Sequence, residues 1–264
     1  MVDINRIDGI GAAIAWVENK GGPFSTWERL AFPEWPCQQY FEDAIYISFA
    51  DPSHEFSKKY LSWAIDTSKR ALEDPRFTIS AENSSKGWMN KPAFPGNVGM
   101  VRAIHALSVA VFNQSAVDAD ELKKSSSEIA TSALFHKGKS WSDDAVQRRY
   151  LYAVRLAMIA GDWEGANHLL AVKRKFDALP KQFEILVAAL RFAVGGKSEQ
   201  ASLELFEEHF QAIRRPGGKD LIRVDAASPE NSYRLELSLI RQRLMQAHSF
   251  PDWKLIFESI NRES

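Results

Sequence analysis

Two stretches of this sequence end like a phosphate-binding loop. HKGKS at residues 136–140 and GGKS at 195–198 both contain the Lys-Ser pair with which such a loop holds a phosphate and its metal ion. The loop also needs a glycine five residues before its Gly-Lys-Ser, and those two positions hold Ala133 and Arg191. Neither stretch lies between a predicted strand and a predicted helix, as the loop requires. Both are therefore predicted to be turns at helix ends, and no nucleotide site is expected.

The residues that bind metals or act as nucleophiles are scattered along the chain. The six histidines include no His-Glu-x-x-His motif and no pair at i, i+4, the spacing that sets two imidazoles on one helix face. His105 falls in an apolar helix, where we expect a packed and hydrogen-bonded side chain. The single cysteine, Cys37, excludes an internal disulfide and a cysteine-based zinc cluster, and it is expected to be a small buried side chain. No metal and no cofactor is predicted.

Acidic residues stand next to each other at Glu42-Asp43, Asp143-Asp144 and Glu207-Glu208. Neighbouring positions on a helix point in directions about 100° apart, so such a pair does not converge on one substrate atom. We expect these pairs on solvated faces or at helix starts. The sequence also lacks the Gly-x-Ser-x-Gly elbow of a serine hydrolase. No catalytic residue is predicted, and an enzyme would need a site assembled from residues far apart in sequence.

Composition narrows the class of protein further. The 264 residues are 45% apolar and 25% charged, as in an ordinary globular protein. A formal net charge of −1 gives no basic excess for binding nucleic acid or an anionic membrane. The longest uncharged apolar run, from Ile104 to Phe112, is too short to cross a bilayer, and the N-terminus does not resemble a secretory signal. We therefore expect a soluble, cytoplasmic protein.

Apolar residues recur at helical spacing along almost the whole chain, and alternating strand patterns are nearly absent. Ser142-Asp143-Asp144 is typical of a helix start, and Gly161 and Gly195-Gly196 are typical of helix ends. The pattern predicts an all-α fold. Helices are expected at about 37–50, 54–73, 97–113, 118–136, 143–160, 163–175, 180–194, 198–214 and 231–247.

Two of these predicted helix pairs share a pattern about 35 residues apart. LAMIAGDWEGANHLL and RFAVGGKSEQASLEL align Gly161 with Gly196 and Ala166 with Ala201. Each is predicted to be a helical hairpin with a two-residue turn, because small residues allow two antiparallel helices to cross closely. A weaker third example runs from Val101 to Ala133. The spacing is that of tetratricopeptide-type repeats, in which each hairpin buries its face on the next.

We therefore predict antiparallel hairpins stacked as a degenerate tetratricopeptide-like repeat, with an irregular helical bundle as the alternative. The chain, 1–264, is expected to be a single all-α domain, with a possible N-terminal subdomain at 1–95 and a helical-hairpin region at 96–264.

Three long connections, 21–37, 76–96 and 214–232, interrupt the helices. Long loops inside a compact domain are often functional, and an exposed tryptophan in one can anchor a partner. Eight tryptophans are present, and several of them fall in these connections. The residues predicted to contact a partner are Trp27, Trp35, Trp88 and Phe94.

The central part of the chain resembles a known family. AVQRRYLYAVRLAMIAGDWEGANHLLAV, followed by QFEILVAALRFAVGGKSEQASLELFEEHF, is similar to the all-helical immunity proteins of bacterial polymorphic toxin systems, particularly the family numbered forty-nine. The likeness covers roughly residues 97–215 and consists of helix-turn-helix texture. It implies a cytoplasmic protein that binds and neutralises a cognate secreted toxin, by covering the active site of the toxin or by blocking its assembly.

Two classes of function follow for a helical stack without catalytic residues. The first is an immunity protein that forms a tight complex with one toxin. The alternative is a helical-repeat adaptor or chaperone, which would bind a protein or peptide in its concave groove. An enzyme is the third possibility.

Overall fold

A computed structural model describes residues 34–51, 53–74, 95–136, 143–171, 181–214, 230–245 and 251–261. Within these ranges nearly every residue is helical and none lies in a strand, so the all-α prediction is confirmed. The helices are α4 (Glu34–Ala50), α5 (Glu55–Glu73), α7 (Pro95–Asn113), α8 (Ala119–His136), α9 (Asp143–Ile159), α10 (Trp163–Ala171), α11 (Lys181–Gly195), the 3-10 helix η4 (Gly196–Glu199), α12 (Gln200–Arg214), α13 (Glu230–Met245) and α14 (Trp253–Asn261).

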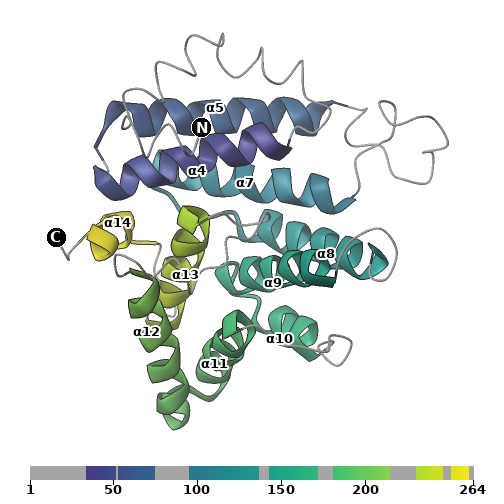
Figure 1. Ribbon diagram of the computed structural model, residues 1–264, viewed down its shortest axis with the longest axis vertical. Coiled ribbons are helices and arrows are strands. Elements are labelled where there is room, and N and C mark those ends of the chain that lie inside the picture. Colours follow the sequence, from purple (N-terminus) through teal and green to yellow (C-terminus); the bar gives the residue numbers. More distant parts are fainter. Residues whose placement is uncertain are drawn as a thin grey trace.

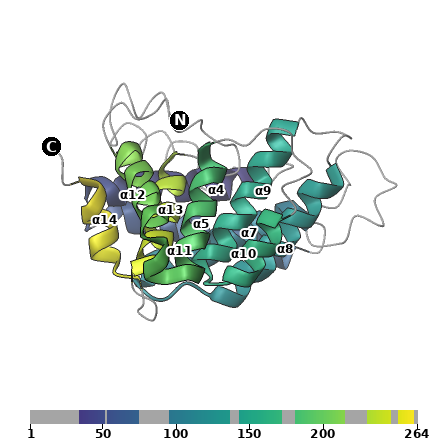
Figure 2. The same cartoon turned by 90° about the horizontal axis from the view of Figure 1, so that it is seen from below.

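From α4 to α12, each of these α-helices packs against the next along the chain (Figure 1). Helices two places apart also touch, α4 against α7 and α9 against α11, as expected when helical hairpins stack on one another. Figure 2 shows the same helices from below, with α14 at one end and α8 at the other. Their buried apolar side chains form one cluster, whose members extend along the sequence from Cys37 of α4 to Phe257 of α14.

The path of the chain changes after α12. Helix α13 lies inside the arc of the stack and contacts α4, α9, α11 and α12 (Figure 1). Every side chain from Leu235 to Ile240 is buried. Helix α14 then packs on α4, where the rings of Phe49 and Phe257 meet edge to face with centroids 5.4 Å apart. The chain therefore fills the concave side of its own stack.

The turn between α9 and α10 shows why the stretch around Gly161 folds as a hairpin. Gly161 has a φ of 75°, a left-handed conformation that costs a residue with a Cβ about 1 kcal/mol or more. Its N–H bonds to the carbonyl of Met158 at 3.0 Å, and the N–H of Asp162 bonds to Ala157 at 2.9 Å, which together close the end of α9. Asp162 Oδ1 then accepts the N–H of Gly165 at 2.9 Å and begins α10. Three residues, 160–162, make this turn, not the two predicted.

The second predicted hairpin, α11–α12, differs from the first at its tip. Gly196 also has a positive φ, 59°, but it starts η4, so the two helices are joined by a 3-10 turn. The predicted equivalence of Ala166 and Ala201 is wrong, because Ala166 is fully buried whereas Ala201 is exposed. An additional helical turn changes which side of the following helix faces its neighbour, so the same spacing in sequence gives a different burial.

In the third hairpin, α7–α8, a glycine lies where the two helices approach closely. A Cβ on Gly99 would lie 3.0 Å from Glu128 Cβ and 3.0 Å from the carbonyl oxygen of Ser125. On the α9 side of α8, Ser126 Oγ donates to the carbonyl of Ala153 at 2.7 Å. These small residues let α8 approach both of its neighbours.

Candidate functional site

Several buried polar side chains gather around α13. Arg155 of α9 and Glu236 of α13 are paired with Nε and Oε2 2.5 Å apart, and their side chains are 0% and 2% exposed. The guanidinium also lies over two rings, with its Cζ 5.0 Å from the centroid of Tyr233 and 5.6 Å from that of Tyr152. The pair thus joins α9 to α13 within the apolar core.

The first turn of α13 is held by a carboxylate from another helix. Glu42 of α4 accepts the N–H of Asn231 at 2.7 Å, the N–H of Ser232 at 2.9 Å and the hydroxyl of Ser232 at 2.7 Å. Burial raises the pKa of Glu42, while these hydrogen bonds act in the opposite direction. The carboxylate of Glu42 therefore takes the place of an N-cap side chain. It accepts hydrogen bonds from donors that the start of α13 would otherwise leave unpaired.

Asp43, next to Glu42, is also buried. Its Oδ1 accepts a hydrogen bond from Gln39 Nε2 at 3.0 Å, and its Oδ2 has no hydrogen-bond partner. Burial raises its pKa to about 7, against the hydrogen bond from Gln39 and with the help of the neighbouring Glu42. The prediction that Glu42-Asp43 lies on a solvated face is wrong. Helix α4 is packed by α5, α7, α13 and α14, so even its acidic positions are covered.

The end of α13 is anchored to the stack as well. Arg241 Nε donates to Glu207 Oε1 of α12 at 2.6 Å, which places one member of the Glu207-Glu208 pair in an ion pair between helices. Arg243 Nε donates to the carbonyl of Ile159 at 3.1 Å, at the end of α9, where a helix leaves carbonyl groups unpaired. Polar contacts therefore hold α13 at its start, its middle and its end.

A serine and a histidine do meet, between α5 and α7. Ser68 Oγ lies 2.9 Å from His105 Nδ1, within hydrogen-bond distance, and 2.9 Å from the carbonyl oxygen of Ile65. Burial lowers the pKa of His105. Ser68 is fully buried, so its hydroxyl has no open path to a substrate. The pair fits the packed, hydrogen-bonded histidine expected at this position.

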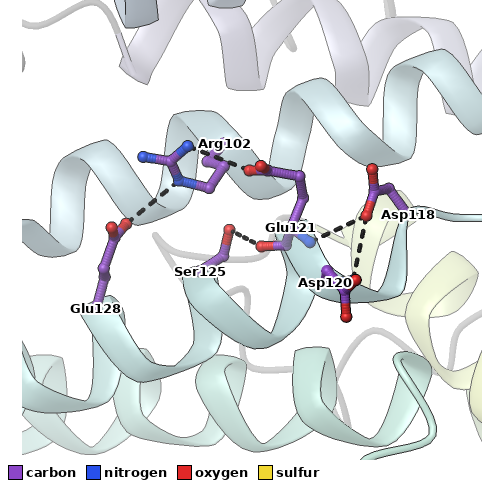
Figure 3. A network of polar contacts seen from close by, with 6 residues as sticks. All are labelled: Arg102, Asp118, Asp120, Glu121, Ser125 and Glu128. Atoms are coloured by element: carbon purple, nitrogen blue, oxygen red, sulfur yellow. Dashed lines mark hydrogen bonds and ion pairs between the residues drawn. The ribbon is translucent and has the colours of Figure 1, made fainter.

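A second polar network lies between α7 and α8 (Figure 3). Arg102 reaches Glu121 with Nη1 and Oε2 3.1 Å apart and Glu128 with Nε and Oε2 3.5 Å apart. Asp118 Oδ1 accepts the N–H groups of Asp120 and Glu121, both at 3.1 Å, and so caps α8. Ser125 Oγ donates to the carbonyl of Glu121 at 2.7 Å. Arg102 therefore joins α7 to α8, while the Asp118 and Ser125 contacts are local to α8.

Metal ligands are not grouped in the part of the chain described: no set of three or more His, Cys, Asp or Glu side chains there could hold an ion. Among the same residues, no helix has the length and apolar character needed to span a membrane. Cys37 is buried, as expected. Gly196, Lys197 and Ser198 form η4 at a helix end, as predicted for that loop-like stretch, whereas residues 137–140 of the other stretch lie outside the described residues.

The aromatic residues predicted to contact a partner are mostly outside this description. Trp27, Trp88 and Phe94 lie outside the described residues. Trp35 was predicted to lie in the connection 21–37. Its backbone instead belongs to α4, which begins at Glu34, and its side chain is not among those described. These four residues remain a prediction.

Sequence reasoning missed the residues buried around α13. One signal was present for Glu42: apolar residues surround it on all sides of its helix, including Tyr40, Phe41 and Ala44, which is typical of a helix buried all round. Arg155 gave a similar signal as a single basic residue in the apolar run 150–160. The partners of both, on α13, are far away in sequence and no spacing rule connects them.

Comparisons of this chain with protein-family models, with curated proteins and with solved structures give no match.

Proposed function

We propose that this chain is a non-catalytic binding protein, and specifically an immunity protein that neutralises a bacterial toxin by forming a complex with it inside the producing cell. The resemblance of residues 145–172 and 182–210 to helical immunity proteins suggests the class of partner. The geometry of the described residues supports binding through the outside of the helical stack.

The observation that carries this proposal is the position of α13. A helical-repeat adaptor of the alternative class binds a peptide in its concave groove. Here α13 lies in that place, with Leu235 and Leu237 fully buried and with the Arg155–Glu236 pair sealed beneath it. A peptide would have to displace a core helix, so the structure favours a partner on the outer surface over a peptide in the groove.

The polar clusters of the described residues also favour binding over catalysis. Ser68–His105 is closed to substrate, Arg155–Glu236 is buried, and Arg102 is engaged by two glutamates. A nucleophile and its base must be able to reach a substrate, and these groups are instead used to join helices.

The proposal is tested by protection of cells. Each gene adjacent to the one for this chain is expressed alone and together with it in the same host. We expect one neighbour to arrest growth alone and to be harmless with this chain, and the two purified proteins to form a one-to-one complex by size exclusion with light scattering. A matched control is an unrelated helical protein expressed at the same level.

If every toxic neighbour still arrests growth in the presence of the chain, the immunity proposal is wrong. Weak binding to many unrelated peptides, without protection, would instead support the adaptor.

A further inference from the structure

We draw no further inference here: the strongest candidate, the exposed apolar side chains of Phe112, Met245 and Leu255 near the ends of α7, α13 and α14, carries nothing because nothing in the structure shows what covers them.

Discussion

Asp43 shows how burial changes the chemistry of a single side chain. The pKa of its carboxyl group is about 7 in the folded chain, raised by burial from an ordinary value of 3.8. The folded state therefore holds this proton more tightly than the unfolded state does. The contribution of Asp43 to the free energy of unfolding is fully favourable below about pH 4 and is lost as the pH rises through 7.

We predict that Asp43→Asn raises the thermal midpoint at pH 8 and changes it much less at pH 5. The amide cannot ionise, so the cost of a buried charge, on the order of 1 to 3 kcal/mol, disappears. Thermal unfolding followed by circular dichroism at the two pH values measures the effect. Asp66→Asn, at an exposed position on α5, is the control. A midpoint that falls more at pH 8 than at pH 5 would contradict the role of burial.

Helix α13 depends at its start on a residue 189 positions earlier in the chain. Two backbone N–H groups of its first turn and the hydroxyl of Ser232 all bond to Glu42. Because this acceptor belongs to α4, the first turn of α13 is capped only when α4 is packed against it. The first turn of α13 should therefore be among the first parts of the chain to open when α4 is altered.

Replacement of Glu42 tests this dependence. Glu42→Ala leaves three donors, two of them buried, without this acceptor and should lower the free energy of unfolding by about 2 to 4 kcal/mol. Glu42→Gln keeps one carbonyl oxygen and should cost clearly less. Urea denaturation gives both values, and hydrogen exchange locates the loss in the first turn of α13. The exposed Glu208→Ala serves as the comparison, and equal effects at positions 42 and 208 would refute the capping role.

Local signals in the sequence were sufficient to predict most helices. Gly161 marks the end of α9 because only a residue without a Cβ adopts its φ at no cost, and Asp162 starts α10 because its carboxylate reaches an N–H three residues later. Helix α14 was not predicted, and the burial of Glu42 was predicted wrongly. Both depend on contacts with distant parts of the chain, which no window of sequence contains.

The same distinction holds for the candidate site. The sequence indicated that His105 is packed and that the Gly-Lys-Ser stretch at 196–198 is a helix end. It did not indicate that Arg155 and Glu236 meet across 81 positions, or that Trp253 Nε1 donates to the carbonyl of Ser115. Long-range pairs of this kind are set by the way the stack curves back on itself.

At the scale of the whole molecule, the position of α13 decides which surfaces are available to a partner. Its apolar residues and its ion pair contribute to that position in different ways. Burial of leucine and isoleucine side chains supplies favourable free energy, about 1.5 to 3 kcal/mol for each one. The Arg155–Glu236 pair gains its attraction only after both charges have lost their water, so its net contribution to stability is small even though each charge needs the other.

We predict that the losses in the free energy of unfolding are not additive when both members of the pair are replaced. Arg155→Met or Glu236→Leu alone leaves a buried charge without its partner and should cost about 3 to 5 kcal/mol, whereas the double variant should recover most of that loss. Urea denaturation of all four chains measures the coupling. If the double variant loses the sum of the two single costs, the two side chains act independently and their pairing does not explain the cost of either single change. If it recovers, the apolar face of α13 is sufficient to keep the concave side closed, and the outer surface of the stack is left for a partner.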